Sequence, residues 1–301
     1  MPHATALRGL YPSWTLAMEA ENKSPRTVRG YLDSLELFAR WLEDNQHPVL
    51  PEDITTALLR TWLVELTETR SASTSRTRWN GLRSFFAWAA EEQEIPANPM
   101  ERVKAPALPE KIIPMLKVEE LKAIIDACDG PLMIDRRDQA LILMYADTGA
   151  RRSELAAAQV EDLDLRERTL RVTGKGRRDR VLPFGARTAR AVDRYLRLRA
   201  RWDTAEGPWL WISERDGAPL SSDAIRQMIR RRGEQAGVKG AHAHQFRHGF
   251  ADAWLRSGGS EGDLMELTGW RSRQMVTRYA AATRAERARE AYKARSPMDN
   301  L

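Results

Sequence analysis

Side chains that can bind a phosphate group or attack one lie at four places in the second half of this 301-residue sequence. Arginine forms forked hydrogen bonds with phosphate oxygens, tyrosine carries a hydroxyl nucleophile, and histidine and lysine can move protons. The four places are TGARRSEL with Arg151, GKG with Lys175, HQFRH with His244 and Arg247, and LTGW, whose Trp270 precedes Tyr279 by nine positions. Each segment alone has an ordinary explanation, such as a helix cap or a solvated turn. Their combination suggests chemistry on a phosphate.

The order of these segments resembles that of the tyrosine recombinases, the family of phage integrases and of bacterial recombinases that resolve chromosome dimers. TGARRSEL is similar to the family signature Thr-Gly-Leu-Arg-x-Ser-Glu-Leu, HQFRH to its His-x-x-Arg box, and LTGW to its last signature before the tyrosine. Ala150 and Arg152 replace the usual aliphatic residues, and Trp270 stands where histidine is commoner. The resemblance implies catalytic roles for Arg151, Lys175, His244, Arg247, Trp270 and Tyr279, with Glu154 and His248 supporting them.

The chemistry of these side chains agrees with such roles. In-line attack on a phosphodiester develops charge on the non-bridging oxygens, which Arg151 and Arg247 can neutralise with planar forks. A phenol with an ordinary pKa of about 10 is a weak nucleophile, so Tyr279 needs a cationic site or a base, and His244 is the candidate to assist. Lys175 is the candidate acid for the leaving 5′ oxygen.

Two further side chains have supporting parts. Trp270 can donate its indole N–H to an oxygen and pack against the site. Glu154 follows Arg151 by three positions and is expected to orient it.

The reaction that the resemblance implies is transesterification through a 3′-phosphotyrosyl bond to Tyr279. The bond energy is kept in this intermediate, so we expect no ATP, metal ion or other cofactor. His242, His244 and His248 suggest a metal site as an alternative, but no carboxylate or thiol stands at a supporting spacing. The implied partners are a double-stranded DNA recombination site and a homo-tetramer in the synaptic complex. The rival functions are a type IB topoisomerase and a catalytically silent DNA-binding accessory protein.

Helices make up most of the predicted structure. Three of them are predicted in the first third of the chain, ahead of the candidate catalytic residues. The segment 24–44 opens with Ser24 as N-cap and Pro25 at the first helical position, and its apolar residues keep helical spacing. Further helices are predicted around 54–66 and 79–89, and their regularly spaced aromatic residues favour core positions over base stacking. The prolines after residue 96 predict a linker at 102–114 between domains 1–101 and 115–301. By resemblance, these are a helical core-binding (SAM-like) domain and a catalytic domain.

The second domain is predicted to be mostly helical, with helices at 118–127, 136–147, 185–201, 222–236, 245–257 and 261–268. Residues 169–173 and 178–182 read as a β-hairpin with Lys175 near its tip. The fold class is therefore mainly α with a small antiparallel β-sheet. The segment 283–296 is expected to form a helix that docks on a neighbouring protomer.

Composition is consistent with a polyanionic partner. The net charge is +6, and the stretch 166–201 holds 13 basic and 3 acidic residues, an excess suited to phosphates. Cys128 is the single cysteine, which excludes an intramolecular disulfide and indicates a role in helix packing. The absence of a long apolar run argues against a membrane span, and we expect a cytoplasmic protein associated with the bacterial nucleoid.

Overall fold

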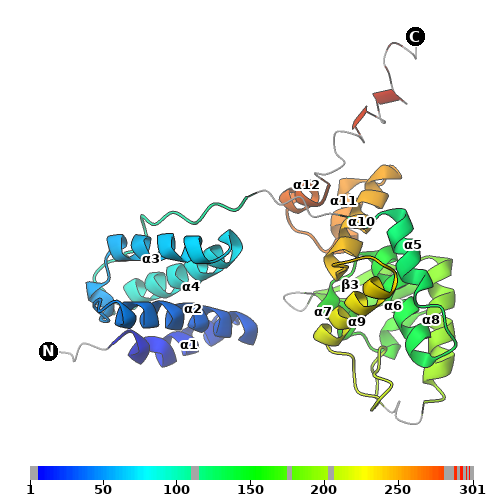
Figure 1. Ribbon diagram of the computed structural model, residues 1–301, viewed down its shortest axis with the longest axis horizontal. Helices are drawn as coiled ribbons and strands as arrows, with labels where there is room; N and C mark the ends of the chain where they lie inside the picture. The colour runs from blue at the N-terminus through cyan, green and yellow to red at the C-terminus, as the bar shows by residue number, and fades with distance from the viewer. Residues whose placement is uncertain are drawn as a thin grey trace. The chain divides into compact units, whose positions relative to one another are not determined.

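The computed structural model describes residues 6–109, 115–174, 178–202 and 207–280, together with a few residues after 287. The chain forms two compact units, Met1–Lys111 and Ile112–Leu301 (Figure 1). Most described residues are helical and the strands form one small antiparallel sheet, so the predicted fold class is confirmed. No helix in the described part of the chain is long and apolar enough to cross a membrane.

The first unit is helical. Its elements are η1 (Leu7–Leu10), α1 (Tyr11–Ala20), α2 (Pro25–Asp44), η2 (Pro51–Asp53), α3 (Thr56–Thr69) and α4 (Ala72–Glu91). Ser24, Thr55 and Ser71 begin α2, α3 and α4, because each side-chain oxygen accepts a backbone N–H of the first helical turn. These three helices were predicted, whereas η1 and α1 were not.

Aromatic side chains fill the centre of the first unit, as their helical spacing predicts. Phe38, Phe85 and Phe86 are fully buried, and Trp62 is 2% exposed. Trp14 of the unpredicted helix α1 meets Phe85 edge-on, with ring centroids 5.2 Å apart. Helix α1 is held by this core rather than by a strong apolar periodicity of its own.

Part of the stretch predicted as a linker packs against the first unit. The Trp79 indole N–H donates to the carbonyl of Val103 at 3.1 Å, and Val103 is buried. Arg76 donates to the carbonyl of Pro106 at 2.9 Å. Residues 110–114 lie outside the described part of the chain, and the linker at 102–114 stays a prediction.

The second unit combines helices with the sheet. Its helices are α5 (Val118–Asp126), α6 (Met133–Thr148), α7 (Arg152–Ala156), α8 (Ala186–Arg199), α9 (Ser222–Gln235), α10 (Ala243–Arg256), α11 (Glu261–Thr268) and α12 (Arg273–Ala280), with the short turn η3 (Val160–Asp162). The strands β1 (Leu163–Asp164), β2 (Thr169–Gly174) and β3 (Arg178–Pro183) pair in the order β1-β2-β3. Figure 1 shows α10, α11 and α12 together at one end of this unit.

Helix α6 is the centre of the second core. Leu141, Ile142 and Met144 are fully buried, and α6 packs against α8 and α10. The sheet contributes the inward-facing residues Leu170 and Leu182, which lie opposite each other on β2 and β3. The hairpin predicted at 169–173 and 178–182 therefore forms, with a third short strand beside it.

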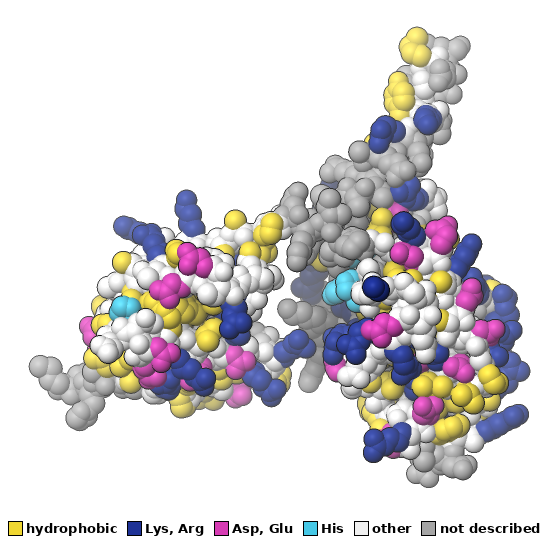
Figure 2. Space-filling model, viewed as in Figure 1, with side chains coloured by type: hydrophobic (Ala, Val, Ile, Leu, Met, Phe, Trp, Pro, Cys, Tyr) yellow, Lys and Arg dark blue, Asp and Glu magenta, His cyan; other side chains and the backbone are white. Residues whose placement is uncertain are grey.

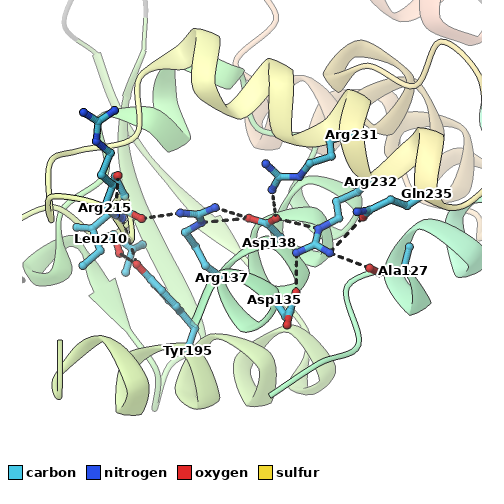
Figure 3. Close-up of polar contacts among 12 residues, drawn as sticks. Ala127, Asp135, Arg137, Asp138, Tyr195, Leu210, Arg215, Arg231, Arg232 and Gln235 are labelled. Atoms are coloured by element: carbon cyan, nitrogen blue, oxygen red, sulfur yellow. Dashed lines mark hydrogen bonds and ion pairs between the residues drawn. The ribbon is translucent and has the colours of Figure 1, made fainter. Parts of the chain in front are cut away.

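A buried ionic network ties α6 to α9 (Figure 3). The Asp138 carboxylate is fully buried and accepts hydrogen bonds from Arg137 at 2.8 and 3.1 Å and from Arg232 at 2.9 Å. Arg232 also donates to Asp135 at 2.8 Å and to the carbonyl of Ala127 at 2.9 Å. The network thereby joins α6, α9 and the end of α5 through hydrogen bonds to buried carboxylate and carbonyl oxygens.

Cys128 has the packing role predicted for it. It is fully buried just after α5, and its thiol donates to the carbonyl of Ile124 at 3.3 Å. Burial raises the pKa of the thiol to about 12, so the cysteine is un-ionised at neutral pH.

Candidate functional site

Arg151 and Glu154 lie where α6 gives way to α7. Gly149 ends α6 with φ +58°, a left-handed conformation that reverses the chain. The Glu154 carboxylate then accepts the backbone N–H of Arg151 at 2.7 Å and its Nη1–H at 2.8 Å. The Glu154 side chain is 2% exposed, so a buried carboxylate holds both the backbone and the guanidinium of Arg151.

A second arginine, Arg180 of β3, binds the same carboxylate and was missed from the sequence. Its Nη1 and Nη2 donate to the two oxygens of Glu154 at 2.5 and 2.7 Å, a bidentate pair. Arg180 lies opposite Val172 in the sheet, on the face that carries the buried residues Leu170 and Leu182. An arginine at an inward-facing strand position was the signal that could have found it.

The two arginines decide the charge state of Glu154. Burial by itself would raise the pKa of this carboxyl, but the hydrogen bonds from Arg180 and Arg151 outweigh burial and lower the pKa. Glu154 is therefore ionised at neutral pH. Its charge is matched by two guanidinium groups.

Arg247 and Trp270 form the other half of the cluster. Arg247 lies in α10 and is 3% exposed, and its guanidinium donates to the carbonyls of Gly149 and, at 2.7 Å, Thr268. Its Cζ atom lies 5.1 Å from the centroid of the Trp270 ring, a cation–π contact. Trp270 is 6% exposed and packs with Ala251 of α10.

Three arginines from different elements meet at the C-terminal end of α11. The last carbonyls of a helix lack partners within the helix and carry the negative end of its dipole. The carbonyls of Leu267, Thr268 and Gly269 accept hydrogen bonds from Arg180, Arg247 and Arg151, respectively. The segment LTGW is thereby fixed relative to both predicted phosphate-binding arginines.

The two predicted histidines lie on α10, on either side of Arg247. His244 is exposed near the start of the helix, whereas His248 is 2% exposed. Figure 2 shows histidine side chains on the surface of the second unit with basic side chains beside them. No three His, Cys, Asp or Glu residues within the described ranges are placed to hold a metal ion, so His242, His244 and His248 do not form such a set there.

The structure describes neither the Lys175 side chain nor that of Tyr279. Lys175 falls in the connection 175–177 between β2 and β3, outside the described residues. Tyr279 belongs to α12, which begins three residues after Trp270, but its side chain also lies outside the described part. The helix predicted at 283–296 likewise falls almost wholly outside it.

An open cavity of about 790 Å³ adjoins the cluster and is lined by, among others, Arg151, Gly174, Arg180, Gly269, Trp270 and Met275. The Arg151 side chain is 34% exposed on its wall, while that of Arg180 is 13% exposed. Gly174 is the last residue before the connection that holds Lys175. A phosphate in this cavity would meet an accessible guanidinium, an indole and the end of the hairpin, which together suit charge stabilisation and proton transfer.

Comparisons with known proteins cover both units. Residues 114–286 match the model of the phage integrase family, and residues 13–93 match the phage integrase N-terminal SAM-like domain. The tyrosine recombinase XerC of Myxococcus xanthus is 30% identical over 286 residues, which cover 93% of this chain and 95% of that protein.

Two solved structures show the same fold at low identity. The XerH site-specific recombinase bound to palindromic difH substrate is 18% identical with a TM-score of 0.75, covering 98% of this chain and 85% of that one. The lambda integrase tetramer bound to a Holliday junction is 17% identical with a TM-score of 0.71, covering 92% and 78%.

Proposed function

Because the chain belongs to the phage integrase family of tyrosine recombinases, we propose that it cleaves and rejoins duplex DNA through a covalent bond to Tyr279. The protein is a site-specific DNA recombinase. The alignment with a tyrosine recombinase runs over nearly the full length of both chains, so the similarity includes both units of the fold.

One observation carries the assignment of the catalytic residues. Arg151, Arg247 and Trp270, which lie up to 119 positions apart in the sequence, meet at the C-terminal end of α11 beside one cavity. The helix that holds Tyr279 starts directly after this point, and the hairpin connection that holds Lys175 starts at the cavity wall. A scissile phosphate in the cavity would thus lie close to Arg151, to Trp270 and to the ends of the segments that lead to Lys175 and Tyr279.

The proposed reaction is a balanced exchange of phosphate esters. The Tyr279 oxygen forms a bond to phosphorus, its proton passes to His244, and the bond from phosphorus to the 5′ oxygen breaks. Lys175 donates a proton to that 5′ oxygen, and Arg151 and Arg247 neutralise the charge on the non-bridging oxygens. Attack by the 5′ hydroxyl of a partner strand then reverses the step.

Glu154, Trp270 and His248 support these groups. Glu154 holds Arg151 through its backbone and side chain, and Trp270 packs against the guanidinium of Arg247. His248, buried one turn after His244 on α10, is proposed to keep that helix in register with the cluster. Because no group in the scheme requires a metal or nucleotide, none is included.

The proposed substrate is duplex DNA held by a homo-tetramer. A lambda integrase of the same fold is described as a tetramer bound to a Holliday junction, and a XerH recombinase as a post-cleavage complex with its substrate. The basic excess of residues 166–201 supports contact with phosphates. Such a protein would act in the cytoplasm, on DNA in the nucleoid.

Covalent capture tests the proposal and identifies the target site in the same experiment. The protein is incubated with nicked duplexes of randomised core sequence, without metal or ATP, and protein–DNA adducts are isolated under denaturing conditions. The captured DNA gives the preferred site, and mass spectrometry gives the linked residue. We expect an adduct at Tyr279 that is absent in Tyr279→Phe.

The same assay separates the rival functions. Sequence-selective binding without any adduct would favour a DNA-binding accessory protein. If the protein forms the adduct and relaxes supercoiled plasmid but never joins strands from two duplexes, a type IB topoisomerase is favoured. Strand exchange between two captured sites supports the recombinase.

A further inference from the structure

We propose that Arg180 is a positioning residue for catalysis: by pairing with Glu154 it leaves N–H groups of the Arg151 guanidinium available for the scissile phosphate. This inference rests on the proposed function of Arg151 as a phosphate-binding residue. Arg180 lies in the cavity wall, but its guanidinium binds protein groups.

The contacts of Arg180 argue against a direct role on the substrate. Its Nε donates to the carbonyl of Leu267 at 3.0 Å, and both Nη atoms donate to Glu154. All three nitrogens of this guanidinium are thus used by protein acceptors, and the side chain is 13% exposed. The Arg151 side chain carries the same guanidinium group but is 34% exposed, so Arg151 can reach a substrate phosphate while Arg180 binds protein groups.

The shared carboxylate explains how one arginine can position the other. An isolated arginine and carboxylate tend to form a bidentate pair, which occupies one whole edge of the guanidinium. Here Arg180 forms that pair with Glu154, so Arg151 donates only Nη1 to the same carboxylate, at 2.8 Å, while its Nη2 donates to the carbonyl of Gly269 at 3.0 Å. Without Arg180, the carboxylate would be free to pair with Arg151 in bidentate fashion and to compete with a phosphate for it.

Arg180 also ties three parts of the site to one point. It belongs to β3, which follows the connection with Lys175, and it bonds to α11 just before the segment that leads to α12 and Tyr279. Gly269 ends α11 with φ +66°, a left-handed conformation that glycine adopts easily, and so presents its carbonyl to Arg151 beside the bond from Arg180 to Leu267. Loss of Arg180 would therefore weaken the hold on β3, on Arg151 and on the end of α11 together.

The test compares Arg180→Met with Arg226→Met. Arg226 lies in helix α9 of the same unit and pairs with Asp223 at 2.8 Å, but its side chain is 48% exposed and it does not line the cavity. The single-turnover rate of adduct formation and the affinity for DNA are measured on the duplex captured with the wild type. We expect Arg180→Met to slow cleavage by roughly 10- to 100-fold, the usual effect of removing a group that orients a catalytic residue, at unchanged affinity. Arg226→Met is expected to match the wild type.

Two further variants keep the inference open to refutation if Arg180→Met folds poorly. Arg180→Lys keeps the charge but cannot bind both carboxylate oxygens in plane, so it should retain most of the rate loss. In a double-mutant cycle with Arg151→Lys, the two losses should not multiply, because Arg180 acts through Arg151.

Each outcome has one meaning. Cleavage by Arg180→Met or Arg180→Lys at the Arg226→Met rate would overturn the inference, and so would losses that multiply in the cycle. A wild-type protein that forms no adduct at Tyr279 would instead refute the proposed function, and the inference would fall with it.

Discussion

Replacing Glu154 with glutamine should destabilise the second unit strongly, although the two side chains have nearly the same shape. The carboxylate accepts four hydrogen bonds, from the Arg151 backbone, from Arg151 Nη1 and from both Nη atoms of Arg180. A glutamine has one oxygen, and its NH₂ group would face arginine donors without an acceptor between them.

The magnitude follows from the burial of the partners. Removing one partner of a buried ion pair costs about 3–5 kcal/mol, because the other charge stays in the core without compensation. Arg180, 13% exposed, is in this position, whereas Arg151, 34% exposed, can recover part of its hydration and adds less. We therefore expect the free energy of unfolding to fall by about 3–5 kcal/mol, a large share of a typical domain stability of about 5–15 kcal/mol.

The loss should depend on pH in a definite direction. The pKa of Glu154 is lowered in the folded protein, so its ionised form stabilises the fold at every pH above the unfolded value of about 4.3. This contribution is lost as the pH falls through the lower, folded pKa. The difference between wild type and Glu154→Gln should therefore be constant near neutral pH and shrink in acid.

Urea unfolding of the full chain, followed by circular dichroism at pH 7 and at acidic pH, measures both effects. Glu161→Gln is the matched control, because Glu161 is an exposed carboxylate of the same unit and its replacement should change stability by less than about 0.5 kcal/mol. If Glu154→Gln unfolds at the same urea concentration as Glu161→Gln, the carboxylate does not hold the arginine cluster and the reasoning is wrong.

Three other predictions concern separate parts of the second unit. Lys175→Ala should slow cleavage by about 10²- to 10⁴-fold, and a 5′-phosphorothiolate substrate, whose leaving group needs no acid, should restore the rate; a variant without such rescue would exclude the general-acid role. Asp138→Asn leaves buried arginines without their carboxylate and should cost about 3–5 kcal/mol, seen as a lower melting temperature; an unchanged melting temperature would contradict this. Gly149→Ala, at φ +58°, would place a Cβ 2.6 Å from the Phe250 ring and should lower the free energy of unfolding in urea by about 2–4 kcal/mol. Gly240→Ala, at φ +73° in open space, should lower it by only about 1–2 kcal/mol. Equal losses would show that the clash with Phe250 is relieved.

Local sequence signals were sufficient to predict most helices and the candidate catalytic residues. Ser24 and Pro25 mark the start of α2, and the apolar spacing of its residues predicts the buried face, because capping and helical periodicity are local properties of the chain. The order of Arg151, Lys175, His244, Arg247, Trp270 and Tyr279 is likewise written in the sequence and by itself points to the family. Helix α1 was missed because Trp14 is buried by contacts with α2 and α4 and not by a regular pattern of its own.

Only the tertiary structure revealed how the cluster is held. Arg180 stands in a hairpin rich in arginines, and its inward-facing position sets it apart from Arg171, but its role depends on a carboxylate 26 positions earlier and a carbonyl 87 positions later. The convergence of three arginines on the end of α11 has the same origin. A helix end with unpaired carbonyls attracts cations, but which cations reach it is decided by the packing of α7, β3 and α10 around it, and such long-range packing is not encoded in any short segment of the sequence.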